Sequence, residues 1–124
     1  QPVIATRAII PPEYLVPIEV DGDSRGKKGE FAIREDANIS SLQTEEVDIK
    51  DVKKGDYLLL LPGSRIPTDG ILAAREGQGK CSYVDEAALS GEPFPVAKTV
   101  GDTIFGSTIN QLSLSLMRVA ATGS

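Results

Sequence analysis

The 124-residue sequence contains no histidine, no tryptophan and only one cysteine, Cys81. The usual side-chain sets that hold zinc or copper are therefore missing, and we expect the chain itself to bind no metal or other cofactor. A lone cysteine cannot form an internal disulfide, which fits a reducing compartment. We interpret Cys81 as a small, buried apolar residue.

Long hydrophobic runs and basic clusters are also missing. No stretch approaches the roughly 20 apolar residues that a membrane-spanning helix requires, and the apolar run 57–61 is far too short. The N-terminus lacks the basic start and apolar core of a signal peptide. A formal net charge of −5, without a basic patch or aromatic platform, argues against a nucleic-acid partner.

What the chain does contain is a core of ordinary size and many closely spaced turns. Hydrophobic residues make up 40% of the sequence, which suits one domain over residues 1–124. Short apolar runs between turns that contain glycine and proline predict strands at 46–49, 57–61, 71–74, 81–84 and 112–119. This pattern predicts a mainly β sandwich or barrel.

Helices have little support in this sequence. We expect one or two short helices at most, near the N-terminus if anywhere. Residues 86–89 are the helical candidate in the second half, with Asp85 as the cap. The glycine-rich, charged segment 21–30 predicts a loop.

One segment is chemically distinctive. Glu92 follows Gly91 and precedes Pro93 and Pro95. Proline has a fixed φ and no N–H, so neither a helix nor a central strand can run through this segment. Gly91 permits backbone angles that other residues avoid. The residues predict a short, stiff-sided loop that presents the Glu92 carboxylate, although a solvated turn is the simpler interpretation of these residues alone.

Other carboxylates have local interpretations. Asp85 and Glu86 are adjacent and point in different directions, so they rarely share a ligand. We interpret Asp85 as a local cap and Glu86 as a surface or interdomain contact. Asp69 and Asp102 each neighbour a glycine, and we interpret both as residues that shape the backbone of turns.

The sequence around Glu92 also resembles a known family. Residues 85–96, DEAALSGEPFPV, resemble the actuator-domain signature of P-type ATPases, D-E-S-x-x-T-G-E-x-x-P-V. Four further segments resemble motifs of that family in the same order: 52–56 (VKKGD), 62–70 (PGSRIPTDG), 100–102 (VGD) and 106–110 (GSTIN). The ordered set is far more specific than a lone tripeptide. Ala87 replaces a common serine and Ser90 replaces the usual threonine, but Ser90 keeps the hydroxyl.

The resemblance implies an architecture and partners. It implies a distorted jelly-roll-like β-sandwich, with residues 21–46 as a variable loop or insertion. The domain would be excised from a larger multi-pass membrane protein, between transmembrane helices on the cytosolic face. Its partners would be the phosphorylation and nucleotide-binding domains of the same protein, and Mg²⁺ and ATP would be cofactors of that parent. The family's D-K-T-G-T segment is absent, so we expect no ATP hydrolysis by this chain alone.

The resemblance also implies a chemical role. In this family an aspartyl phosphate forms on a separate domain, and the actuator loop promotes its hydrolysis. Glu92 would orient and deprotonate the attacking water, Gly91 would allow close backbone approach, and Ser90 would hold the loop or contact its neighbour.

The transported ion and the rival functions stay open at this point. Residues 66–70 and 106–111 look most like the heavy-metal branch, with copper first and cadmium or zinc behind; calcium and proton pumps share a similar loop. A non-catalytic β-rich binding module and a regulatory domain that lost the chemistry are the alternatives. A buried Glu92 paired with a basic side chain would exclude the catalytic assignment.

Overall fold

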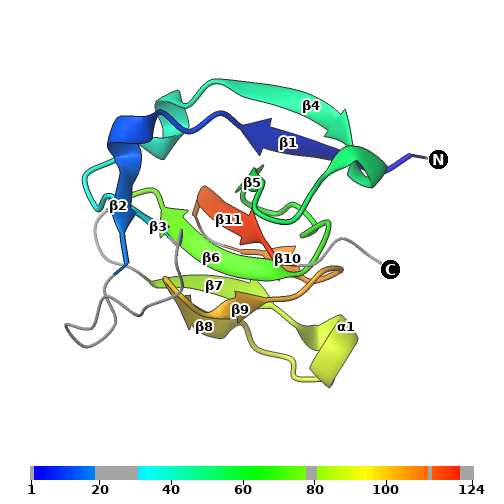
Figure 1. Cartoon of the computed structure of the whole chain (residues 1–124). Coiled ribbons are helices and arrows are strands. Elements are labelled where there is room, and N and C mark those ends of the chain that lie inside the picture. The colour runs from blue at the N-terminus through cyan, green and yellow to red at the C-terminus, as the bar shows by residue number, and fades with distance from the viewer. Residues whose placement is uncertain (1, 19–30, 78–80, 112, 121–124) are drawn as a thin grey trace.

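Antiparallel sheets form most of the computed structural model, which describes residues 2–18, 31–77, 81–111 and 113–120 (Figure 1). Within these ranges the largest sheet has six strands in the order β4-β1-β5-β11-β6-β9. Their bounds are Thr44–Asp48 (β4), Ile4–Ala8 (β1), Tyr57–Leu60 (β5), Ser115–Val119 (β11), Gly70–Arg75 (β6) and Thr103–Ile104 (β9).

Two smaller sheets complete the described part of the fold. One has the order β10-β7-β8, and the other pairs β2 with β3. Their bounds are Ile109–Asn110 (β10), Cys81–Asp85 (β7), Val96–Thr99 (β8), Leu15–Pro17 (β2) and Phe31–Ile33 (β3). The prediction of a mainly β fold is confirmed.

Helical structure is short. Among the described residues the one α-helix is α1, Ala87–Ser90, between β7 and β8. The 3₁₀ turns are η1 (Pro12–Tyr14), η2 (Ile39–Ser41) and η3 (Ile49–Asp51). The helical candidate at 86–89 matches α1 to within one residue. The described N-terminal segment 2–18 holds a 3₁₀ turn and no α-helix, because its prolines disfavour a longer helix. No helix in the described ranges is long and apolar enough to cross a membrane.

The six-stranded sheet buries apolar side chains on both faces. In β5, Leu58 is fully buried and lies opposite the equally buried Met117 of β11. These two residues share a cluster with Val84 of β7, so the sheets pack through a common core. Tyr57 and Leu59, which alternate with Leu58, pack against a second cluster on the other face. Burial of this apolar area is the main force that stabilises the fold.

The segment 21–46, expected as a loop or insertion, has structure in its described part. Residues 21–30 lie outside the described residues, but β3, η2 and the start of β4 fall within 31–46. Ile33 and Ile39 are buried in the second cluster. This part of the segment therefore contributes to the core.

The expectation for Cys81 is wrong: its side chain is exposed. Cys81 is the first residue of β7, where Ser82 and Val84 are buried, whereas Cys81 and Tyr83 are exposed. The strand alternation therefore places Cys81 on the outer face. The last predicted strand, 112–119, is confirmed as β11 from Ser115, and residue 112 lies outside the described residues.

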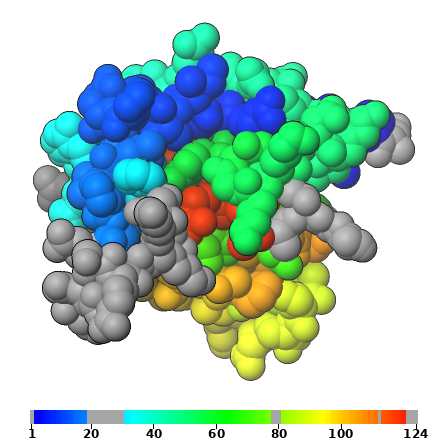
Figure 2. Space-filling model, in the orientation of Figure 1, coloured from blue at the N-terminus to red at the C-terminus, as the bar shows by residue number. Residues whose placement is uncertain are grey.

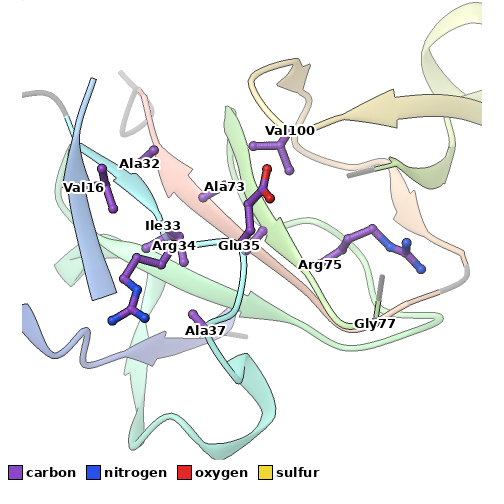
Figure 3. A pocket seen from close by; sticks show the side chains of 11 residues that line it. Val16, Ala32, Ile33, Arg34, Glu35, Ala37, Ala73, Arg75, Gly77 and Val100 are labelled. Carbon is purple, nitrogen blue, oxygen red and sulfur yellow. The ribbon is translucent and has the colours of Figure 1, made fainter. Parts of the chain in front are cut away.

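A pocket of about 520 Å³ opens beside β3 and β6 (Figure 3). Its described lining includes the side chains of Arg34, Glu35 and Val100. In Figure 3 the Glu35 carboxylate points toward Val100, whereas the Arg34 guanidinium extends away from it. None of its lining residues belongs to the segment from α1 to β8.

Candidate functional site

The segment from α1 to β8 projects from the body of the protein (Figure 1). In the space-filling view the yellow residues of this region form a protrusion at the lower edge (Figure 2). Its apolar side chains are open to solvent, with Leu89 56% and Phe94 75% exposed. Glu92 lies between them and is also exposed.

Local hydrogen bonds build the turn that precedes Glu92. The Asp85 Oδ1 atom accepts a hydrogen bond at 2.9 Å from the amide of Ala87, the first residue of α1, although Glu86 and not Asp85 occupies the N-cap position. The Gly91 amide donates to the Ala87 carbonyl at 2.9 Å, and Gly91 has a left-handed φ of 75°. Glycine adopts this conformation without the strain that a Cβ atom would cause. The sequence therefore ends α1 at Gly91 and redirects the chain.

The Ser90 hydroxyl connects the helix to the loop. Its Oγ atom donates to the Glu86 carbonyl at 3.1 Å and accepts a hydrogen bond from the Glu92 amide at 3.2 Å. Both contacts need a hydroxyl but no methyl group. Serine at this position can therefore make the hydrogen bonds of the threonine that the motif usually has.

The Glu92 carboxylate is left available. Its backbone is held by Ser90, but within the described part of the chain no hydrogen bond or ion pair engages the side chain. The carboxylate can therefore accept a proton or a hydrogen bond from a partner outside this chain. The arrangement that would exclude a catalytic assignment, a buried Glu92 paired with a basic residue, is not the one observed.

A paired charge lies at the base of the same loop. Lys98 Nζ in β8 is 2.9 Å from Glu86 Oε2, and each side chain is only 13% exposed. Glu86 is therefore not an open surface residue, and its carboxylate contacts Lys98 within the domain. Pairing of β7 with β8 brings together two residues that lie far apart in the sequence, and no local pattern could have indicated this contact.

Two aspartates of the motif segments shape turns, as predicted. The Asp69 Oδ1 atom accepts a hydrogen bond from the Gly106 amide at 2.8 Å. The Asp102 Oδ2 atom accepts one from the Thr99 amide at 2.9 Å. A Cβ atom at Gly106 would lie 3.1 Å from the Thr68 Cα atom, so glycine also allows close packing of these turns.

Asn110, the last residue of the GSTIN segment, is a buried link between strands. It is 1% exposed, and its Nδ2 atom donates to the carbonyls of Ser113, Leu60 and Leu61 at 2.7, 3.1 and 3.3 Å. No local pattern in the sequence indicates this role. Asn110 and the two aspartates therefore stabilise turns, whereas the carboxylate of Glu92 is free.

The described residues contain no group of three histidine, cysteine, aspartate or glutamate side chains placed to hold a metal ion.

Comparison with known proteins gives the family. Residues 32–124 match the P-type ATPase actuator domain. A probable copper-exporting P-type ATPase of Archaeoglobus fulgidus is 43% identical over 77 residues, which are 62% of this chain and 9% of that protein. A zinc-transporting ATPase of Bacillus subtilis is 39% identical over 77 residues, which are 62% of this chain and 11% of that protein. A silver exporting P-type ATPase of Salmonella typhimurium is 40% identical over 78 residues, 63% of this chain and 9% of that protein.

A solved structure agrees with these matches. The crystal structure of a zinc-transporting PIB-type ATPase in the E2.Pi state has a TM-score of 0.57 and 30% identity, and the match covers 64% of this chain and 12% of that chain. The chain spans about a tenth of the length of the relatives it matches. Because the family match covers more than half of its residues, this chain belongs to the P-type ATPase actuator domain family.

Proposed function

We propose that this chain is the actuator domain of a heavy-metal-transporting P-type ATPase and that its loop 90–92 promotes hydrolysis of an aspartyl phosphate on another domain of that protein. The observation that carries the proposal is the exposed, unpaired carboxylate of Glu92 on a backbone fixed by Ser90 and Gly91. Copper is the proposed cargo, since copper-exporting ATPases are among the relatives. Relatives named for zinc and silver make these ions the next candidates.

Glu92 has the chemistry that this hydrolysis needs. As the water oxygen forms its bond to phosphorus, the acyl O–P bond breaks, and the aspartate carboxylate departs as the leaving group. The proton of the water passes to the Glu92 carboxylate, and inorganic phosphate is released. A carboxylate within hydrogen-bond reach of the water supplies both general-base help and orientation.

Gly91 and Ser90 support this role in different ways. A Cβ atom built on Gly91 would meet no heavy atom of the described chain within 4 Å, so the space beside it is open to a partner. A side chain there would reach into that space and would strain a φ of 75°. The Ser90 hydroxyl accepts a hydrogen bond from the Glu92 amide, which fixes the backbone position from which the Glu92 side chain extends.

The remaining parts of the reaction belong to the parent protein. We assign the phosphorylated aspartate, ATP and Mg²⁺ to its phosphorylation and nucleotide-binding domains, which this loop would meet. The described residues offer no cluster of metal ligands, and no step assigned to this chain passes through Mg²⁺ or ATP. The domain would lie on the cytosolic face of the membrane. The transported cation would contact the transmembrane helices and not this domain.

The proposal is tested by steady-state assays of the parent ATPase with Glu92→Gln, which removes the base but keeps the shape. We expect phosphate release to fall while phosphoenzyme accumulates. Glu46 is an exposed residue of β4, and Glu46→Gln is the matched control that should behave as wild type. Normal phosphate release by Glu92→Gln would instead favour a regulatory domain that keeps the fold without the chemistry.

A further inference from the structure

A shielded ion pair joins the two ends of the loop that carries Glu92. Glu86 precedes α1 and Lys98 lies in β8, and their side chains are 2.9 Å apart and 13% exposed. The Arg34–Asp36 pair, by contrast, has side chains that are 44% and 71% exposed. Glu86 Oε2 has no hydrogen-bond partner among the described residues, so the Lys98 ammonium is the group that compensates its charge. Because desolvating a charge costs free energy unless it is paired, separation of these two side chains would be costly.

The strand register explains why Lys98 points inward. Lys98 lies opposite the buried Ser82 of β7 and on the same face of β8 as Val96, whereas the alternate positions of β8 are exposed. Its ammonium group also lies 5.4 Å from the centroid of the Phe105 ring. This distance allows a favourable cation–π interaction. Lys98 is therefore held from two sides.

Glu86 transmits this anchor to the loop. Its carbonyl accepts hydrogen bonds from the Leu89 amide at 2.8 Å, the Ser90 amide at 2.9 Å and the Ser90 Oγ atom at 3.1 Å. Ser90 Oγ in turn accepts the Glu92 amide hydrogen bond. A continuous series of contacts thus runs from the Lys98 ammonium through Glu86 and Ser90 to the backbone of Glu92.

The loop needs such an anchor because α1 is short and exposed. A helix of four residues has too few internal hydrogen bonds to be stable by itself, and α1 has no buried residue. Its direction must come from contacts at its ends. Joining Glu86 to Lys98 closes the loop at its base and reduces the conformations open to the segment between them.

We propose that Glu86 and Lys98 are positioning residues for Glu92: their ion pair sets the direction in which the loop presents its carboxylate. The catalytic meaning of this inference rests on the proposed function. The positioning itself can be measured in this chain alone.

The first experiment measures hydrogen-exchange rates of backbone amides by NMR in wild type, Glu86→Gln and Lys98→Met. Lys98→Met removes the charge and keeps a flexible chain against Phe105. We expect exchange at Ser90 and Gly91 to become about tenfold faster, because local opening is easier without the anchor. Exchange at the core amides of Leu58 and Met117 should not change. If the ion pair only stabilised the fold as a whole, exchange would become faster in both the loop and the core.

Three further variants sharpen the test. Lys98→Arg keeps the charge and should keep the slow exchange, and the charge swap Glu86→Lys with Lys98→Glu should restore part of it. Asp36→Asn breaks an exposed ion pair away from the loop and is the matched control, with no change expected. If Glu86→Gln fails to fold, the exchange rates of Lys98→Met and Lys98→Arg are compared to test whether the charge of Lys98 is needed. Wild-type exchange in Lys98→Met, or equal acceleration of loop and core, overturns the inference.

Phosphoenzyme decay in the parent ATPase then separates this inference from the proposed function. Lys98→Met should slow decay about tenfold by misplacing the carboxylate and leave the KM for ATP unchanged. If the phosphoenzyme of Glu92→Gln decays at the wild-type rate, the proposed function fails, and the exchange rates still test whether Glu86 and Lys98 position the loop. If Glu92→Gln slows decay and Lys98→Met does not, the positioning role is overturned.

Discussion

At the scale of single residues, the buried polar side chains of this domain stabilise its turns. Asn110 is the clearest case, because its one buried amide group donates to the carbonyls of Leu60, Leu61 and Ser113 and so joins three segments of the chain. A buried carbonyl without a donor costs more than a typical hydrogen bond contributes. The asparagine of the GSTIN segment is therefore explained by its contribution to the stability of the fold.

Asn110→Ala should lower the free energy of unfolding by about 1–3 kcal/mol, since it removes a buried side-chain donor that three carbonyls share, although those of Leu61 and Ser113 keep hydrogen bonds from Ser64 and Ser115. Chemical denaturation followed by circular dichroism measures this change. The neighbouring exposed residue provides the control, and Gln111→Ala should change stability very little. Equal stabilities of the two variants would contradict this account of Asn110.

Tyr57 gives a pH-dependent prediction. Burial raises the pKa of Tyr57 above its ordinary value of 10.0, and the charge of Arg118, opposite it in β11, partly offsets this. The folded protein thus holds the phenolic proton more tightly than the unfolded chain. The stabilisation is fully present below about pH 10 and is lost as the pH rises through the raised value.

We therefore expect the free energy of unfolding of wild type to fall more steeply than that of Tyr57→Phe as the pH rises above about 10. Denaturation curves at several pH values measure the difference. Parallel pH profiles for the two proteins would show that Tyr57 makes no such contribution.

At the scale of elements, the region around α1 depends on its end contacts. The helix ends at Ser90, and Gly91 directly after it has a φ of 75°; Gly55 has a φ of 92° in a turn outside the loop. A Cβ atom at either glycine would meet nothing within 4 Å. Alanine at each position should therefore cause a similar backbone strain without a clash.

Gly91→Ala and Gly55→Ala form a matched pair. We expect each to lower the free energy of unfolding by about 1–2 kcal/mol, because a non-glycine residue is strained in the left-handed region. In the parent ATPase only Gly91→Ala should slow phosphoenzyme decay. If both variants slowed decay equally, the effect would come from lost stability and not from the geometry of the loop.

Much of the element content could be predicted from the sequence, for identifiable reasons. Apolar runs bounded by turn residues gave β5 and β6 close to their observed limits. The predicted helix 86–89 is shifted by one residue from α1, because Glu86 is the cap that precedes the helix and its side chain contacts Lys98. Strand β8 was missed because it follows Pro95 and lacks an apolar run.

The features that could not be predicted from the sequence depend on contacts between strands. The Glu86–Lys98 pair depends on the β7–β8 register, and the exposure of Cys81 depends on which face of β7 is covered. Neither is encoded in a local pattern. By contrast, the exposure of Glu92 could be predicted, because glycine and proline restrict the backbone wherever they occur.

At the scale of the whole molecule, the family motifs divide into two kinds. The segments that contain Asp69, Asp102 and Asn110 hold turns of the β framework together. The segment 85–96 projects from that framework and presents Glu92. A β framework with a projecting loop that carries an unpaired carboxylate suits a domain that acts on a separate partner, which is the central claim of the proposed function.

The most direct measurement is the decay of phosphoenzyme in the parent ATPase, comparing wild type with Glu92→Gln. The protein is phosphorylated with labelled ATP, chased with unlabelled ATP, and sampled for acid-stable label. General-base catalysis predicts normal formation and a decay slower by about 10²–10⁴-fold. Decay of the variant at the wild-type rate would contradict the assignment of Glu92 as the residue that activates the water.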